Sequence, residues 1–327
     1  MPSQSAVTAM HRRLLASRPA YLPALTLALA LLVANVVAQP SFLAPSRLPE
    51  MLGLAAPLLI VAMASAPSIL SGGIDISVGP LVGFTSIFYV TVLLSGGLGD
   101  PLPAIPIVLA LGAAVGVING VAIAMLRFPP VLATLCMFFV LGGVNLKLLP
   151  SAEAAQSNWV SDLSDTVWFF PGALLTIGGP LLIWWLLGRT AFLRNLYAAG
   201  GNDAAALSAG VRVGAARVGA YALGGLFAAI AGFALTSVLG GADASVSNTY
   251  TLVAIAAVSL GGVSLGGGRG GLVGALVGGV CIYLIQSLLT TVGASAGWLP
   301  ASYGAFLVLG IVFAARHAQR GARTVGA

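Results

Sequence analysis

The sequence predicts an all-α fold, a polytopic membrane helix bundle of about ten transmembrane helices with both termini in the cytoplasm. Of the 327 residues, 59% are hydrophobic and only 7% are charged, whereas soluble domains carry about 25% charged residues. The apolar residues form long runs, not the short alternating strands of a membrane barrel. Almost the whole chain is therefore expected in or near lipid.

Ten apolar segments have roughly the length needed to span a bilayer. They are residues 21–39, 49–70, 76–95, 103–126, 130–149, 169–188, 217–239, 250–265, 271–291 and 299–315. Glycine-rich breaks separate the second from the third and the eighth from the ninth, and such breaks are found in re-entrant segments as well as in loops. The first run is long for a signal peptide and lacks a good cleavage site, so we interpret it as a membrane helix. This predicts a cytoplasmic segment (1–20), a transmembrane permease domain (21–315) and a cytoplasmic tail (316–327).

The distribution of lysine and arginine predicts the orientation, because cytoplasmic loops carry an excess of both. With a cytoplasmic N-terminus and ten alternating spans, only Arg47 and Lys147 fall outside. The residues that fall inside are Arg12, Arg13, Arg18, Arg127, Arg189, Arg194, Arg212, Arg217, Arg269, Arg316, Arg320 and Arg323. Topology thus accounts for the net charge of +6, and no nucleic-acid partner is expected.

The few residues able to perform chemistry are poorly placed for it. His11 and His317 lie at the chain ends without nearby carboxylates, and Cys136 and Cys281 lie in apolar segments, where we expect them to act as small packing residues. We therefore predict no metal, no cofactor and no catalytic residues. The chain also lacks the Gly-x-x-x-x-Gly-Lys-(Ser/Thr) motif of a P-loop, so we expect it to have no ATPase site of its own.

Glycine patterns favour helix packing over nucleotide binding. Residues 266–271 match Gly-x-Gly-x-x-Gly, but the flanks are apolar spans and no acid follows, so this run is interpreted as a tight turn. Two series of glycines spaced four residues apart predict smooth helix faces for close contact. They are Gly112, Gly116 and Gly120, and Gly270, Gly274 and Gly278.

The run Ser-Gly-Gly-Ile-Asp-Ile-Ser-Val-Gly at 71–79 places an acid between two apolar segments. An ionisable residue at such a place usually has a function, because it is costly near a bilayer. Asp75 would line, gate or brace a translocation path. Alternatively, it would cap the N-terminus of the third span, where both Asp75 and Ser77 offer acceptors. Both interpretations can hold together.

The longest inner loop, about 189–216, contains a predicted short helix over 203–209. Asn202 is expected to cap it, Asp203 is favourable in its first turn, and Gly210 suits the position after its end. The helix is either a rigid lever or an ordinary amphipathic helix resting on the inner membrane face.

Four stretches carry a resemblance to one family. Residues 71–79 resemble Gly-Gly-Ile-Asp-Leu-Ser-Val-Gly, with Ile76 in place of Leu. Residues 200–210 resemble Gly-x-Asn-x-x-Ala-Ala-x-x-x-Gly, and the two others are Asn-Gly at 119–120 with 126–135, and 254–270. These patterns are similar to those of permease subunits of bacterial ribose/xylose/galactose-type ABC importers, over about residues 50–310. Cys136 replaces the usual Gly, Leu-Gly-Gly at 141–143 an Arg-Gly pair, and residues 283–287 an asparagine-rich patch, which weakens any transfer of substrate identity.

The resemblance implies a permease subunit of an ATP-driven importer in the bacterial cytoplasmic (inner) membrane. It would form the translocation path for a sugar delivered by a periplasmic or lipid-anchored binding protein. It would pair with a second copy or another permease, and it would bind membrane lipid and a cytoplasmic ABC ATPase. The residues expected to couple to that ATPase are Gly200, Gly201, Asn202, Ala205, Ala206 and Gly210.

A neutral sugar needs hydroxyl, amide and aromatic groups along its path. The candidate path or gate residues are Asp75, Ser77, Phe84, Thr85, Asn119, Asn145, Tyr283 and Gln286. The two outer cations, Arg47 and Lys147, are expected to dock acids of the binding protein. In the outer loop near 150–168, Trp159 and Trp168 are expected to anchor at the membrane interface.

Three other functions are alternatives to a sugar permease for a chain of this composition. A branched-chain amino-acid ABC permease has this broad architecture, but the motifs around Asp75 and Gly261 resemble the sugar type. A gradient-driven secondary transporter usually places ionisable residues within its spans, and only Asp75, at a break, comes near. An intramembrane enzyme would need a catalytic constellation that the sequence lacks.

Overall fold

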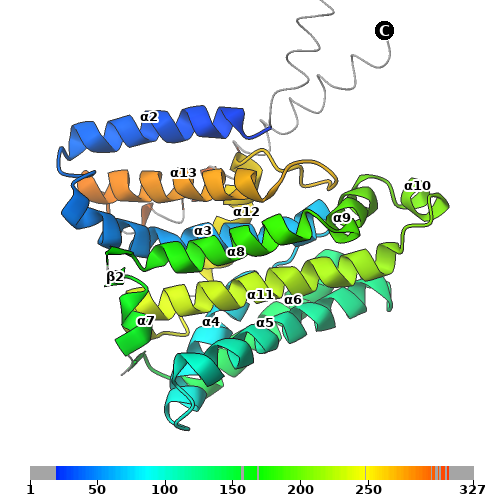
Figure 1. The fold of residues 1–327 in the computed structure, drawn as a ribbon, viewed down its shortest axis with the longest axis horizontal. Coiled ribbons are helices and arrows are strands. Elements are labelled where there is room, and N and C mark those ends of the chain that lie inside the picture. Colours follow the sequence, from blue (N-terminus) through cyan, green and yellow to red (C-terminus); the bar gives the residue numbers. More distant parts are fainter. Residues whose placement is uncertain are drawn as a thin grey trace, which may run out of the picture.

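The computed structural model describes residues 20–295 except 156, 157, 168 and 247, together with 297, 298, 301, 303–305 and 308. This part of the chain consists mainly of helices that lie side by side with their axes roughly aligned (Figure 1). The helices are α2 (Leu22–Ala38), η1 (Pro45–Arg47), α3 (Leu48–Leu70), α4 (Val78–Phe88), η2 (Tyr89–Leu94), α5 (Pro101–Ala124), α6 (Pro130–Leu148), α7 (Asn158–Asp162), α8 (Ala173–Leu187), α9 (Ala191–Gly201), α10 (Asp203–Ser208), α11 (Val213–Leu239), α12 (Thr249–Leu260) and α13 (Leu272–Thr291).

Each of the first nine expected segments contains a helix, while the tenth, 299–315, lies largely outside the described residues. Five helices are long and apolar enough to cross a membrane: α3 together with η1, and α5, α6, α11 and α13. Helices α8 and α9 would add a sixth span if the bent pair counts as one. The apolar helices α2, α4 with its π-helical continuation η2, and α12 are shorter. The helical class is thus observed, and the number of about ten spans stays a prediction.

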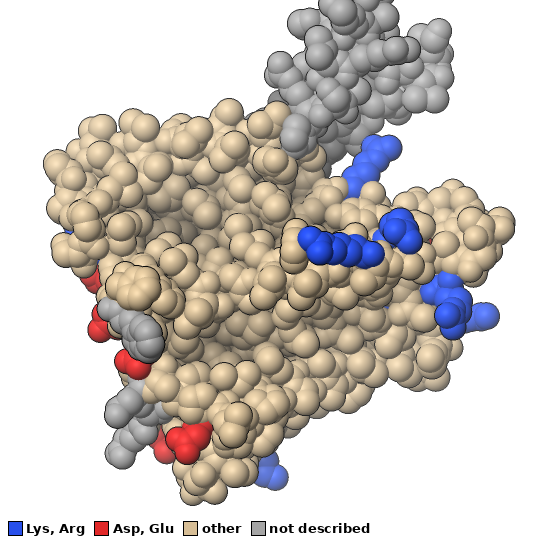
Figure 2. Space-filling model, in the orientation of Figure 1, with Lys and Arg blue, Asp and Glu red and all other residues tan. Residues whose placement is uncertain are grey.

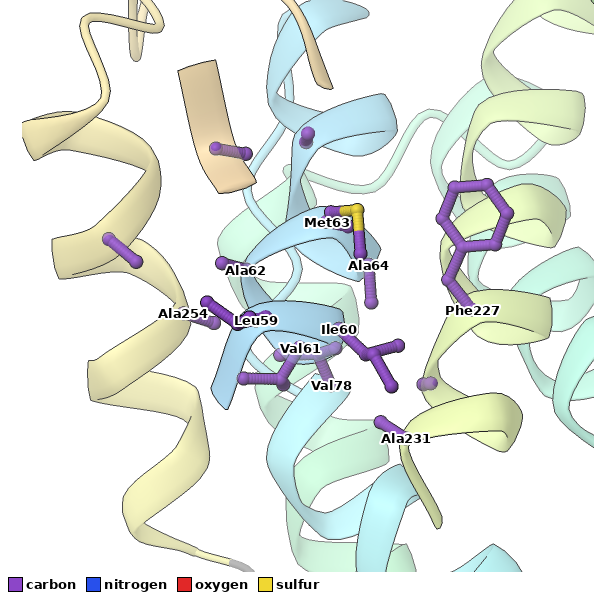
Figure 3. Packing of buried hydrophobic residues seen from close by; sticks show 14 of the residues in the cluster. Leu59, Ile60, Val61, Ala62, Met63, Ala64, Val78, Phe227, Ala231 and Ala254 are labelled. Carbon is purple, nitrogen blue, oxygen red and sulfur yellow. The ribbon is translucent and has the colours of Figure 1, made fainter. Parts of the chain in front are cut away.

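Helix α3 is the centre of the bundle. Every residue from 55 to 70 is buried, as expected for a helix that is apolar on all sides. Figure 3 shows its side chains between Phe227 and Ala231 of α11 on one side and Ala254 of α12 on the other. Because α3 is enclosed by its neighbours, whatever moves either end of it must also displace them.

Glycines bring α5 and α11 into backbone contact. A Cβ at Gly112 or Gly116 would collide with the carbonyl oxygen of Gly225 or Tyr221, and one at Gly120 would lie 2.7 Å from the Cα of Val218. On α13, a Cβ at Gly274 or Gly278 would strike the carbonyl oxygens of Gly261 and Ala257 around the end of α12. The predicted packing role of both glycine series is therefore confirmed for these five residues.

The inner loop contains more structure than the sequence predicted. Besides the expected α10, it holds α9, which turns by 90° from α8 after a short break. Gly200 and Gly201 end this helix and are not loop residues. The reason is a face of α9, with Leu193, Leu196 and Ala199, that is buried against the bundle.

Two short antiparallel sheets lie in the described part outside the helices. β1 (Glu153–Ala154) pairs with β4 (Gly241–Ala242), and β2 (Thr166–Val167) pairs with β3 (Phe170–Pro171). The all-α prediction did not include them. They arise because the long loop before α8 satisfies part of its backbone by pairing with itself and with the segment after α11.

One packing prediction is corrected and one stays untested. The Nε1 of Trp159 donates to the Gly99 carbonyl at 2.8 Å, and its ring packs against Tyr89 and Phe233; that it anchors at the membrane interface stays a prediction. Trp168 lies outside the described residues. Cys281 is buried and packs on α2, but Cys136 is exposed, because it lies with Leu132 and Phe139 on a face of α6 that the described residues leave open.

Charges separate along the helix axes. In Figure 2 the acidic residues gather at the end that carries α7 and β2, and most cations lie at the opposite end around α9 and α10. This separation is the one that the predicted topology requires. Which end faces the cytoplasm stays a prediction.

The close contact of α5 with α11 predicts that Gly116→Ala lowers the free energy of unfolding by about 1–3 kcal/mol, because the added methyl group meets backbone that cannot rotate away. The matched control is Gly143→Ala on α6, where a Cβ has open space around it; we expect a change within about 0.5 kcal/mol. Denaturant unfolding of the purified protein in detergent measures both. Equal effects would contradict the packing role of Gly116.

Candidate functional site

The break between α3 and α4 forms the first part of the candidate site. Helix α3 ends where the Ser71 amide bonds back to the carbonyls of Pro67 and Ser68 and Gly72 adopts a left-handed φ of 88°, a conformation that favours glycine. The chain then runs without helical structure to Val78, where α4 begins. This places seven residues, 71–77, between two helices without an intrahelical ladder, with Ser71, Gly73, Asp75 and Ser77 buried in the bundle.

Asp75 is 5% exposed and is held by its own loop. One carboxylate oxygen accepts hydrogen bonds from the backbone amide of Ser77 at 2.9 Å and from its hydroxyl at 2.6 Å. Asn119 of α5 donates to the same hydroxyl at 2.9 Å. No cation among the described residues forms an ion pair with Asp75. These bonds compensate part of the cost of burying a charge.

The capping alternative is only partly met. The N-cap position of α4 is Ser77, which makes no side-chain cap bond, and Asp75 lies two residues earlier. Asp75 closes a turn onto the Ser77 amide, so it braces the start of α4 without being the N-cap itself. Asn119 connects this turn to α5, because its side-chain amide donates to the Ser77 hydroxyl.

Two threonines from other helices hold the backbone of the same segment. Thr134 of α6 accepts from the Ile76 amide at 3.1 Å. Thr251 of α12 donates to the Ile76 carbonyl at 2.9 Å and accepts from the Gly79 amide at 3.2 Å. The sequence places Thr134 in one of the stretches of resemblance but predicts no role for it. It does not predict a role for Thr251 either, because no local pattern distinguishes that residue.

Three further candidate path residues lie along α4 or beside it. Asn145 of α6 is 2% exposed and donates to the Pro80 carbonyl at 3.0 Å. Thr85 bonds to carbonyls of its own helix and lies against Gly232 of α11. Phe84 is half-buried, with its ring 6.1 Å from that of Phe88. All three border α4, which begins at the Asp75 segment.

Tyr283 and Gln286 lie elsewhere. They line a pocket of about 580 Å³ between the start of α3, α13 and the chain that follows α2. The other lining residues are Gln39, Phe42, Arg47, Glu50, Met51, Leu54, Ser287, Thr290 and Thr291. This pocket, the α13 pocket, lies at the opposite end of α3 from Asp75.

The two expected docking cations are in different surroundings. Arg47 is half-buried in the α13 pocket, with Nη1 3.4 Å from the Ser41 hydroxyl. Lys147 is exposed in the last turn of α6. The structure therefore places only one of them beside candidate path residues.

The expected coupling residues lie on α9, on α10 and just beyond it. Asn202 caps α10 by accepting from the Ala205 amide at 3.0 Å, and Gly210 has a φ of 79° after its end, as predicted. Ala206 is buried. Leu207, which sequence reasoning did not single out, is 61% exposed. An exposed apolar side chain on an outlying helix offers a contact for another protein.

Gly200 faces inward, toward the end of α3. A Cβ there would collide with the Leu70 carbonyl oxygen, which also accepts from the Gly268 amide at 3.0 Å. The Tyr197 hydroxyl donates to the Gly270 carbonyl at 2.9 Å. Helix α9 is thus joined both to the end of α3 and to the glycine-rich turn between α12 and α13.

A bundle of apolar helices, a polar break inside it and a short exposed helix at one end are features of a membrane transport protein. The chain belongs to the family described as branched-chain amino acid transport system / permease component, whose profile matches residues 48–315.

Relatives extend over most of the chain. The ribose import permease protein of Escherichia coli (strain K12) is 33% identical over 279 residues, which are 83% of this chain and 86% of that protein. The fructose import permease protein of Rhizobium meliloti is 30% identical over 309 residues, 90% of this chain and 85% of that protein. The autoinducer 2 import system permease protein of Escherichia coli O9:H4 (strain HS) is 35% identical over 269 residues, 79% and 76% respectively. No solved structure gives a significant match. The resemblance to sugar permeases is confirmed.

The Asp75 bonds predict different effects for two substitutions. Asp75→Asn keeps an oxygen that accepts from Ser77 and removes a buried charge, so the free energy of unfolding should change by less than about 1 kcal/mol. Asp75→Ala leaves the Ser77 amide without its partner and should lower that free energy by about 1–3 kcal/mol. Denaturant unfolding in detergent compares them. A large loss in the asparagine variant would show that the charge itself stabilises the fold.

Proposed function

We propose that this chain is the permease subunit of an ATP-driven ABC importer in the bacterial inner membrane. It forms the path for a sugar or a sugar-like small molecule delivered by an extracytoplasmic binding protein. The observation that carries the proposal is that relatives named for ribose and fructose import cover more than four-fifths of the chain. The apolar helices and the exposed inner helix α10 suit this role.

We assign the translocation path to two regions. The α13 pocket is the outer mouth, because Tyr283 offers an aromatic face and Gln286 an amide to a sugar ring, and its volume of about 580 Å³ is in the usual range for small-molecule sites. The Asp75 segment, with Ser77 and Asn119, is the inner gate. Phe84, Thr85 and Asn145 border α4, which leads away from that gate.

The exposed helix α10 is the contact for the cytoplasmic ATPase. Its ordered cap at Asn202 and its end at Gly210 make it a short rigid unit, and Ala205 and Leu207 are exposed for docking. Gly200 and Ala206 serve differently, because they set how closely α9 and α10 approach the bundle, whereas a Cβ at Gly201 would have open space. Rigid-body movement of such a helix is a common way to drive alternating access.

Exposed cations and an exposed apolar helix face point to further partners. Arg47 and Lys147 are the cations that we assign to docking acids of the binding protein. The exposed apolar side chains of α6, among them Leu132, Phe139 and Leu146, are more than half exposed. They suit contact with membrane lipid and with a second permease copy.

Branched-chain amino-acid import is the second candidate. The family's description names it, and the α13 pocket holds both Arg47 and Glu50, a cation and an anion of the kind that an amino acid would require. The names of the relatives favour the sugar. Only measured substrate preference separates the two.

The deciding experiment is purification of a tagged chain from its native membrane, followed by reconstitution with the proteins that accompany it. We expect an ABC ATPase, and ATP-dependent uptake of ribose or fructose that excess leucine does not inhibit. Uptake of leucine would establish the second candidate. Recovery of the chain alone, with uptake that persists without ATP, would refute an ATP-driven importer.

Normal uptake by Asp75→Asn in the same assay would show that the path needs no charge at this position.

The exposed position of Leu207 predicts that Leu207→Glu reduces the amount of ATPase recovered with the chain by about fivefold or more, since loss of an interface anchor costs more than about 1 kcal/mol. The control is Leu98→Glu, which makes the same exchange at an exposed leucine of the turn before α5. Quantitative blotting of co-purified ATPase measures both. Equal recovery from the two variants would exclude α10 as the docking helix.

The aromatic face in the α13 pocket predicts that Tyr283→Ala slows substrate uptake at low concentration by about two- to tenfold, matching an aromatic contact of about 0.5–1.5 kcal/mol. Tyr283→Phe keeps the ring and should transport nearly as well as the unaltered protein. Initial rates in proteoliposomes decide this. Unchanged uptake by the alanine variant would remove the pocket from the path.

A further inference from the structure

Arg217 connects three separate parts of the chain. It lies in the second turn of α11, and its Nη2 donates to both carboxylate oxygens of Asp203 on α10, at 2.8 and 2.7 Å. Its Nε donates to the carbonyl of Ser71 at 3.4 Å. A single guanidinium thus joins the exposed inner helix to the first residue of the segment that carries Asp75.

Helix α10 has few other attachments to the bundle. Ala206 is its buried residue, packed with Ala199, Val213 and Ala216 in a small cluster apart from the main core. The remainder of α10 is exposed. Apart from the backbone connections before and after α10, the ion pair between Arg217 and Asp203 is therefore the polar link through which a displacement of α10 reaches α11.

Stability does not explain this ion pair. The side chains of Arg217 and Asp203 are 26% and 47% exposed, and ion pairs so open to water contribute little to folding. What the pair supplies is geometry. The rigid planar guanidinium presents Nη2 to Asp203 and Nε to Ser71 at the same time, two separate donor nitrogens that a lysine would lack.

Arg217 acts on a segment that neighbouring helices hold at several points. One turn further along α11, the buried Tyr221 lies against Gly73, where a Cβ would collide with its hydroxyl. Beyond Gly73, Ile76 is bonded to Thr134 and Thr251. These contacts give a movement of Ser71 a route to Asp75 and to α5, α6 and α12, because Gly73, Ile76 and Ser77 each touch another helix.

We propose that Arg217 is a positioning residue for transport: with Asp203 it converts displacement of α10 into displacement of residues 71–77 and so links ATP hydrolysis to opening of the Asp75 gate. This inference rests on the proposed function, which supplies the force on α10. Arg217 lies outside the stretches by which the chain resembles its family, and Asp203 lies at a position that the 200–210 pattern leaves unspecified.

The test uses the reconstituted complex of permease, ATPase and binding protein, with Arg217→Gln and Asp203→Asn. Arg212→Gln is the matched control, because Arg212 is exposed in the same loop and loses the same charge. Three quantities are measured for each: ATPase recovered with the permease, stimulation of ATP hydrolysis by the binding protein, and substrate imported per ATP hydrolysed.

We expect both variants to assemble and to unfold as the unaltered protein does. We expect substrate imported per ATP to fall about fivefold or more, the usual scale of coupling between sites. The double variant should be no worse than either single one, because both remove the same link. Arg212→Gln should import normally.

Unchanged import per ATP in Arg217→Gln would overturn the proposal. So would a loss of import that only follows a loss of assembly or of folding, since that outcome describes a structural brace. Failure of the proposed function itself looks different: the unaltered chain would then recover no ATPase, or would import without ATP.

Discussion

Backbone that leaves helical geometry inside an apolar bundle must find its hydrogen-bond partners within the protein. Residues 71–77 meet this constraint with their own side chains and with side chains from three other parts of the chain. Ser77 binds Asp75 and Asn119, and Ile76 binds Thr134 and Thr251. Because the partners belong to α5, α6 and α12, the position of one short segment depends on where several helices stand. A polar break is thereby made sensitive to movements of the whole bundle.

Glycines allow the close backbone contacts at the inner end of the bundle, next to this segment. At the inner end, Gly200 of α9 approaches the Leu70 carbonyl, and Gly268 donates to the same oxygen. Any larger residue at position 200 would separate α9 from α3. The end of α9, the end of α3 and the turn after α12 consequently meet at one place, immediately before the Asp75 segment. A force on α10, which follows directly on α9, would act there first.

Much of the fold could be predicted because its physical causes are local in sequence. Span-length apolar runs indicated helices at nine described positions, and the cap at Asn202 with Gly210 predicted α10 almost to the residue. Four-residue glycine spacing predicted the contact of α5 with α11. Helix α9 was missed because it is short and lies between two spans, where a connecting loop is expected. The ring contacts of Trp159 were not predicted, because tryptophan suits a membrane interface and a protein interior equally well.

The candidate site was predictable only in its unusual residues. Asp75 is conspicuous because an acid is costly among apolar segments, and Asn119 and Asn145 because amides are rare there. Thr251, Thr134 and Leu207 are ordinary residues in their segments, and only their neighbours in space give them importance. The pairing of Tyr283 with Arg47 in one pocket likewise joins residues more than two hundred positions apart.

By itself the sequence determined that this chain is a helical membrane protein, which segments are helical, where glycines permit contact, and to which family it is similar. Each of these depends on composition or on spacing within a few turns. The tertiary structure alone decided that α3 is enclosed, that the Asp75 segment is tied to three other helices, and that Arg217 joins α10 to Ser71. Those contacts depend on how helices distant in the sequence stand beside each other, and no local pattern records that arrangement.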